Sequence, residues 1–154
     1  MSNMPIRLRI ANPEDVNFIF SSWLRNYRAS EMTRPMSNEV FYAEQHRLIE
    51  ALILKSKVVI ACNNNDPSQM YGWICAGETD GIFTLHYIYV KHAFRRMGIA
   101  KMLIEACGHT GASAGIYTHH TFPMTLWANR YLLLFQPYVL TLNYTKLVEE
   151  DLDE

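Results

Sequence analysis

The 154-residue sequence is poor in several features that would mark a specialised class of protein. It has only three cysteines, Cys62, Cys75 and Cys107, an odd number with no CxxC spacing, so we interpret them as reduced, mostly buried thiols. No apolar run approaches the roughly 20 residues that span a membrane. No basic segment followed by an apolar one marks a signal peptide. The net charge of −1 argues against a general nucleic-acid-binding surface. These absences predict a cytoplasmic protein without a membrane or nucleic-acid partner.

What the sequence does contain is the composition of an ordinary globular protein. Hydrophobic residues make up 49% of the chain and charged residues 19%. The length suits one domain with a sizeable core. We expect that domain at residues 1–148 and a short acidic tail at residues 149–154. No internal repeat or linker is evident.

Hydrophobic periodicity predicts ten elements. In order they are a strand at 6–10, helices at 13–27 and 39–55, strands at 57–62, 71–76 and 83–90, a helix from about 99, a strand at 116–121, a helix at 125–135 and a strand at 139–144. The three middle strands are joined by tight turns and predict an antiparallel meander. The strand at 116–121 follows a helical crossover, which favours parallel pairing with the strand at 83–90. The pattern therefore predicts an α+β fold with a mixed, mostly antiparallel sheet, one parallel pair, and helices on both faces.

The most informative segment is the predicted strand, turn and helix at residues 85–106. Its turn has the form R-x-x-G-x-A, with Arg95, Gly98 and Ala100 at the fixed positions. A strand that enters a helix through such a turn leaves backbone N–H groups unpaired at the positive end of the helix dipole. Gly98 lets the backbone approach a ligand closely, and Arg95 and Arg96 add positive charge. The turn therefore predicts a phosphate or pyrophosphate site.

These residues and the order of elements resemble the GNAT superfamily of N-acetyltransferases, whose acetyl-CoA motif is (R/Q)-x-x-G-x-(G/A). The resemblance covers nearly the whole chain, including the initial strand at 6–10 with Asn12-Pro13-Glu14-Asp15 after it. The run LHYIYVKHAFRRMGIA also resembles small GNAT-like proteins of tailed bacteriophages. The resemblance implies a GNAT-like fold with a splayed parallel pair, acetyl-CoA as co-substrate, and transfer of an acetyl group to a small-molecule or protein amine.

The resemblance also implies which residues contact acetyl-CoA. The strand end would pair with the pantetheine arm, and the turn would bind the pyrophosphate. The residues concerned are Ile88, Tyr89, Val90, Arg95, Arg96, Met97, Gly98, Ile99, Ala100 and Lys101. No metal is implied.

The catalytic residues are less well defined. Many GNAT enzymes carry a glutamate on the strand at 83–90 as general base, but here the nearest ionisable group is His86. A histidine hydrogen-bonded in the core is the alternative interpretation. Glu78 and Asp80 precede this strand and are the other carboxylate candidates. The resemblance implies a tyrosine that protonates the leaving thiolate, which favours Tyr131 slightly over Tyr138.

Other candidate residues carry weaker signals. His119 and His120 are neighbours on a predicted strand and should point to opposite faces, which disfavours a shared metal ion. The first two helices and their loop should form the acceptor side, with Arg28, Glu31 and Arg34; Trp23 and Tyr27 fall on the core stripe of the first helix.

The sequence leaves two functions open. One is an acetyl-CoA-dependent N-acetyltransferase, for which the family resemblance implies a homodimer as one option. The other is a GNAT-fold protein without transferase activity, such as a binding or structural component of a virion, which the missing glutamate favours. An unrelated module that binds another phosphate ligand is the third interpretation.

Overall fold

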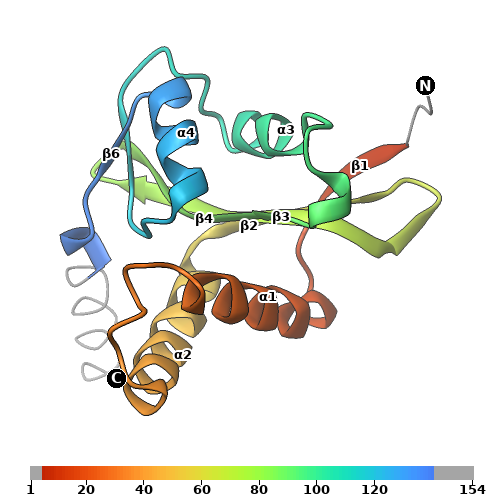
Figure 1. Ribbon diagram of the computed structural model, residues 1–154. Helices are drawn as coiled ribbons and strands as arrows, with labels where there is room; N and C mark the ends of the chain where they lie inside the picture. Colours follow the sequence, from red (N-terminus) through yellow and green to blue (C-terminus); the bar gives the residue numbers. More distant parts are fainter. Residues whose placement is uncertain (1–4, 141–154) are drawn as a thin grey trace, which may run out of the picture.

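Six strands form one sheet in which the order across the sheet equals the order along the chain (Figure 1). The computed structural model describes residues 5–140. The strands are β1 (Ile6–Ile10), β2 (Lys57–Asn63), β3 (Asp66–Thr79), β4 (Ile82–Val90), β5 (Gly115–Tyr117) and β6 (Leu133–Phe135). Strands β1 to β4 pair antiparallel, and β5 pairs parallel with β4. The expected α+β fold class is confirmed. A second parallel pair, β5 with β6, was not expected from the sequence.

Helices cover both faces of this sheet, as predicted. On one face lie α1 (Val16–Arg28) and α2 (Asn38–Lys55); on the other lie α3 (Ile99–Ala106) and α4 (Phe122–Tyr131) (Figure 1). Two short 3₁₀ helices, η1 (Pro13–Asp15) and η2 (His92–Phe94), precede α1 and α3. No helix among residues 5–140 combines the length and the apolar character that crossing a membrane requires.

Each face has its own hydrophobic core. The α1 and α2 face buries Ile19, Trp23, Tyr27, Phe41, Ile49 and Leu52 against Trp73 and Tyr87 of the sheet, together with further strand residues. Trp23 is fully buried and Tyr27 is 8% exposed, so the prediction that both belong to the core is confirmed. The α3 and α4 face buries, among others, Leu103, Ile104 and Tyr131 against Leu85, Tyr117 and Leu133.

The C-terminal elements differ most from the prediction. The expected helix at 125–135 ends at Tyr131, because Leu132 adopts a left-handed conformation with φ of 55°. Leu133–Phe135 is then strand β6, in which Leu133 is buried and Leu134 is 61% exposed. The expected strand at 116–121 is only Gly115–Tyr117. The expected last strand at 139–144 is wrong at residues 139 and 140, which are helical; its remainder, and the proposed tail at 149–154, lie outside the described residues.

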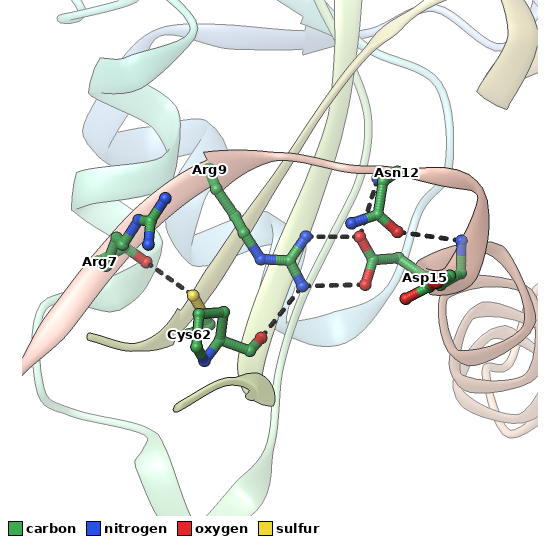
Figure 2. Close-up of polar contacts among 7 residues, drawn as sticks. Arg7, Arg9, Asn12, Asp15 and Cys62 are labelled. Carbon is green, nitrogen blue, oxygen red and sulfur yellow. Dashed lines mark hydrogen bonds and ion pairs between the residues drawn. The ribbon is translucent and has the colours of Figure 1, made fainter. Parts of the chain in front are cut away.

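An ion pair fixes the start of α1 to the edge of the sheet (Figure 2). The guanidinium of Arg9 on β1 donates to both carboxylate oxygens of Asp15, over 2.6 and 2.9 Å, and also donates to the Pro67 carbonyl. Asp15 accepts a further bond from the Asn12 backbone N–H, while the Asn12 side chain accepts from the Glu14 N–H. This capping box is the helix start that the sequence predicted at Asn12-Pro13-Glu14-Asp15, and it closes as a 3₁₀ turn before α1.

Gly72 lets β3 approach the end of β4, and we expect its replacement by alanine to destabilise the fold. A Cβ at this position would lie 2.5 Å from the Tyr89 carbonyl oxygen and 3.1 Å from the Val90 Cα. Both contacts are with backbone, so a strand must shift, and overpacking of this kind costs about 1–3 kcal/mol. Chemical denaturation of Gly72→Ala measures this cost.

The matched control is Gly77→Ala on the same strand. A Cβ there would meet only the Ser56 Oγ at 3.9 Å, an ordinary contact. Equal stability of the two variants would show that the close approach at Gly72 carries no cost.

Candidate functional site

The turn between β4 and α3 presents unpaired backbone N–H groups. Gly98 precedes α3 in a left-handed conformation with φ of 79° and ψ of 10°, and no side chain caps the helix. The first hydrogen bond of the helix runs from the Met102 N–H to the Gly98 carbonyl, over 3.0 Å. The N–H groups of Ile99, Ala100 and Lys101 therefore have no acceptor within the helix. They point out at the positive end of the helix dipole, an arrangement suited to an anion.

The space around this turn fits a phosphate group. A Cβ built on Gly98 would meet no atom within 4 Å, so the space beside the turn is open. Arg96 also has a left-handed backbone, with φ of 67°, and is exposed. Met97 is 48% exposed. Arg95 instead folds back, and its Nε donates to the Val90 carbonyl over 3.1 Å. Arg95 thus fixes the turn to the end of β4, while Arg96 and the N–H groups remain available to a ligand.

Strands β4 and β5 pair briefly and then diverge. Their register contains only Thr84 with Ile116 and Leu85 with Tyr117, followed by one bond from the Thr118 N–H to the Leu85 carbonyl. Next to this point β4 has a bulge, because Tyr87 pairs with Cys75 of β3 while Leu85 pairs with the adjacent Ala76. The extra residue is His86.

Beyond the bulge, β4 has one free edge. Ile88, Tyr89 and Val90 pair with β3 on one side. On the side of β5, none of these three residues has a strand partner among residues 5–140. This open edge leads through η2 to the turn at Gly98, so an unpaired strand edge and a candidate anion site follow one another along the chain. An extended chain with a phosphate at its end would fit both.

The parallel strands bring several chain segments to the same end of the sheet. Strands β4, β5 and β6 run in one direction, so their C-terminal ends share one edge. Beyond β5 lie Thr118 and His119. Beyond β6 lies Tyr138, and the Gln136 N–H donates to the Tyr117 carbonyl there, over 2.9 Å. Sequence reasoning did not single out Thr118, since a lone threonine after a short strand carries no signal.

His86 is a buried residue rather than one open to solvent. It is 3% exposed, and its Nδ1 lies 3.0 Å from the Thr118 Oγ1. Burial lowers the pKa of His86 to about 4, so its ring is neutral at pH 7. The interpretation of His86 as a histidine hydrogen-bonded in the core is therefore confirmed, and its role as general base stays a prediction.

The two tyrosine candidates lie in different places. Tyr131 is 4% exposed, and its backbone lies beside Gly111, near the start of β5. The Tyr131 carbonyl accepts a hydrogen bond from the His109 Nε2, over 2.7 Å. Tyr138 is 79% exposed and follows the C-terminal end of β6, the edge at which β4 and β5 diverge. The topology therefore brings Tyr138, and not Tyr131, to the end of the sheet where β4, β5 and β6 have their C-terminal ends.

The remaining candidates are separated from this edge or from one another. Glu78 and Asp80 lie at the turn between β3 and β4, at the opposite end of β4. His119 packs against Trp23, whereas His120 packs against Tyr117 and Phe135, so the two histidines face different sides. Within residues 5–140, no group of three or more metal-binding side chains could hold an ion.

The loop between α1 and α2 is held by Arg28. Its guanidinium donates to the carbonyls of Thr33 and Met36 and to the Asn38 side chain. Glu31 and Arg34 are exposed on the same loop. Arg28 therefore has a structural part in shaping the loop, and Glu31 and Arg34 remain open to a ligand.

An open apolar groove of about 550 Å³ between α1 and α2 is lined by other residues, among them Phe20 and Leu54.

Comparison with known proteins identifies the family of this chain. The model of the acetyltransferase (GNAT) family matches residues 17–129. The chain belongs to this family. The match includes the turn at Gly98, the divergence of β4 and β5, and most of α4. The GNAT resemblance drawn from the sequence is thereby confirmed. No curated protein sequence matches the chain.

Two of the solved structures to which the chain is similar agree with this GNAT assignment at the level of the fold. A "Putative acetyl transferase from Pyrococcus furiosus" is 21% identical, with a TM-score of 0.56 over 80% of this chain and 89% of that chain. The PaiA N-acetyltransferase from Thermoplasma acidophilum, in complex with coenzyme A, is 16% identical, with a TM-score of 0.50 over 68% and 70%. Apo-form YjaB from Escherichia coli is 18% identical, with a TM-score of 0.48; 67% of this chain covers 64% of its length.

Proposed function

We propose that this GNAT protein is an acetyl-CoA-dependent N-acyltransferase that moves an acetyl group to an amine. The observation that carries the proposal is the continuity between the open edge of β4 and the unpaired N–H groups after Gly98. A pantetheine arm resembles a short extended peptide, with amides that can pair with a strand edge. A pyrophosphate at its end would accept bonds from the turn. The fold shared with a coenzyme A complex of an N-acetyltransferase supports the same assignment.

In this proposal the acetyl-CoA site has two parts. Ile88, Tyr89 and Val90 pair with the pantetheine arm. The turn holds the pyrophosphate through backbone N–H groups, Arg96 and, at the start of α3, Lys101. Lys101 lies 4.0 Å from Glu105 on an exposed helix face, a weak contact that phosphate could replace. Arg95, Met97, Ile99 and Ala100 complete the set by shaping the turn, and Ile99 and Ala100 anchor it to the core.

The reaction needs a neutral amine, a stabilised oxyanion and a proton for the departing thiolate. The amine nitrogen forms a bond to the acetyl carbon, the carbon–sulfur bond breaks, and the sulfur takes up one proton. We assign the donation of that proton to Tyr138, because it is exposed and follows β6, whose C-terminal end lies at the same end of the sheet as those of β4 and β5. Tyr131 is the alternative donor suggested by the sequence. It is the last residue of α4, so it would need to act from the start of β6 and not from its end.

A thermal-shift and thiol-release experiment tests this function. Acetyl-CoA at 100 times its Kd should stabilise the chain by about 2.7 kcal/mol. A panel of amines should then yield free CoA thiol. Tyr138→Phe should lower kcat by about 100-fold, the range expected of one general acid, and should lower it more than Tyr131→Phe does. Absence of a thermal shift would contradict the proposal, and a larger loss in Tyr131→Phe would assign the donor to Tyr131.

A second function has its own support in the absence of a carboxylate on β4. His86, the residue at the bulge of that strand, is buried and neutral. This environment suits a GNAT-fold protein that binds acetyl-CoA without transferring its acetyl group, as a binding or structural component. A clear thermal shift with no thiol release from any amine would favour this function.

Several finer predictions follow only from the family resemblance or the composition. They are the cytoplasmic location, the bacteriophage origin with a place in a virion, and the homodimer. Size-exclusion chromatography with light scattering tests the homodimer directly.

A further inference from the structure

Strand β6 forms the edge of the described sheet opposite to β1 (Figure 1). Two hydrogen bonds show which side of β6 faces its neighbour. The Gly115 N–H donates to the Leu132 carbonyl, and the Gln136 N–H donates to the Tyr117 carbonyl, both over 2.9 Å. Alternate residues of a strand direct their backbone groups to the same side. The even-numbered residues from 132 to 136 therefore direct theirs toward β5.

The backbone groups of Leu133 and Phe135 consequently point away from β5, to the outer side of β6. Neither the N–H nor the C=O group of these two residues has a hydrogen-bond partner on that side within residues 5–140. Unpaired donors and acceptors along a strand edge are a template for pairing with a further strand.

The two edges of the sheet differ in charge. Strand β1 carries Arg7 and Arg9, and charged side chains on an edge strand oppose pairing with another chain. Strand β6 carries no charged residue, and Arg130 is the only Asp, Glu, Lys or Arg between positions 113 and 140. Apolar side chains are exposed instead: Leu132 is 54% exposed and Leu134 is 61% exposed. The β6 edge therefore lacks the charges that would keep another strand away.

The three residues of β6 are complementary to themselves about a two-fold axis at Leu134. In an antiparallel pair centred there, Leu133 of one copy lies opposite Phe135 of the other, and their outward groups exchange both N–H···O=C bonds. The symmetry repeats this exchange, so every outward group of both copies finds a partner. Leu134 then lies opposite Leu134 of the other copy, in a position where side chains approach closely. An uncharged edge meets its own copy without repulsion between like charges.

We propose that β6 is the contact surface for a second copy of this chain, which pairs antiparallel with it about Leu134 and joins the two sheets into one. The exposed surface of Leu132, Leu134 and Tyr138, which is 79% exposed, supplies roughly half of the ~800 Å² per partner that a standard interface buries. The interface therefore belongs to the small class typical of transient complexes, with a dimer Kd in the micromolar range. This inference goes beyond the proposed function and does not depend on acetyl transfer.

Sedimentation velocity of the full chain, from about 1 μM to about 1 mM, should show a monomer that converts to a dimer. Leu134→Lys should raise the dimer Kd at least about 10-fold, because it places two ammonium groups directly opposite each other. The fold should tolerate this change, since Leu134 is 61% exposed. Leu126→Lys is the matched control: Leu126 is 64% exposed but lies on α4, so the dimer Kd should stay at the wild-type value.

A charge swap tests the two-fold axis itself. Leu134→Glu should raise the Kd as Leu134→Lys does, and an equimolar mixture of the two variants should dimerise again, because residue 134 of each copy then meets the opposite charge. A mixture that stays monomeric would overturn the axis at Leu134. A wild-type Kd in Leu134→Lys would overturn β6 as the contact surface.

A wild-type chain that stays monomeric up to about 1 mM would overturn the proposal as a whole. Hydrogen exchange would then show what covers the edge: slow exchange of the Leu133 and Phe135 amides in that monomer would assign it to another segment of the same chain, such as residues 141–154. None of these measurements uses acetyl-CoA. Their failure would therefore leave the proposed function standing, and a failure to bind acetyl-CoA would leave the dimer standing.

Discussion

Gly98→Asp is expected to raise the Kd for acetyl-CoA by at least about 100-fold, a loss of about 2.7 kcal/mol of binding free energy. The substituted carboxylate would occupy the open space beside the turn, where no protein atom lies within 4 Å of a built Cβ. Its charge would repel a pyrophosphate, and its bulk would block the approach of the ligand to the N–H groups of α3. Isothermal titration calorimetry and the thermal shift with acetyl-CoA both measure this loss.

The same substitution should leave the fold nearly intact. The φ of 79° at Gly98 is unfavourable for most side chains, but aspartate tolerates the left-handed region better than most. A carboxylate before α3 also interacts favourably with the helix dipole, by about 0.3–1 kcal/mol. Circular dichroism should therefore show a wild-type spectrum and a similar melting temperature.

Gly108→Asp is the matched control for this experiment. Gly108 follows the other end of α3, has φ of 86°, and also has open space at its Cβ position. The backbone cost of the two substitutions is therefore comparable, and only the place of the charge differs. If Gly108→Asp weakened acetyl-CoA binding as much as Gly98→Asp, the turn at Gly98 would not be the phosphate site.

Asp15→Ala is expected to give the largest loss of stability, about 2–4 kcal/mol, because it leaves a partly buried guanidinium without its anion. The side chains of Arg9 and Asp15 are 14% and 6% exposed. The Arg9 Nε is buried and makes no hydrogen bond within residues 5–140, and the Asp15 carboxylate is the anion that pairs with this guanidinium (Figure 2). Urea denaturation measures the change in the free energy of unfolding.

The Arg9 and Asp15 pair also predicts that the free energy of unfolding depends on pH. The hydrogen bonds from Arg9 hold the pKa of Asp15 below its ordinary value of 3.8, against the opposing effect of burial. A folded-state pKa below the unfolded one means that the stabilisation is complete above pH 3.8 and is lost as the pH falls through the lower, folded-state value. The wild-type chain should lose this stability in acid, while Asp15→Ala should show a flatter dependence over the same range.

Glu14→Ala is the control for both measurements. Glu14 is the neighbouring carboxylate in the same turn and is exposed. Its removal should change the free energy of unfolding by less than about 0.5 kcal/mol, as is usual for surface substitutions. A loss as large as that of Asp15→Ala would mean that the charge of the turn, and not the buried pair, stabilises this start of α1.

The elements that the sequence predicted well are those that short-range interactions specify. Asn12 and Pro13 predict a helix start from capping chemistry alone, and the structure forms that capping box. The stripe of Trp23 and Tyr27 on α1 follows from helical spacing, which a single helix contains within itself. The turn at Gly98 likewise needs only its neighbours, since a strand, a left-handed glycine and a helix are local features.

The features that the sequence could not determine concern segments whose state depends on distant partners. Leu133 and Leu134 suit a helix by composition, but pairing with β5 makes them a strand once Leu132 has turned the chain. On α2, apolar residues occur on more than one side, and the sheet selects Phe41 and Ile49 for burial while Val40 is left 52% exposed. Periodicity cannot choose between such faces, because the choice is made by the surface that the helix packs against.

The family fold and the candidate anion-binding turn could therefore be predicted from the sequence, because both are encoded in local patterns of glycine, charge and hydrophobic spacing. Only the tertiary structure decided which residues lie near the point where β4 and β5 stop pairing. Residues 86 and 118 are 32 positions apart, and their hydrogen bond exists because a bulge in β4 and the short β5 bring them together. Tyr138 reaches the same edge through the parallel pairing of β6 with β5, a long-range contact with no signature in the sequence around it.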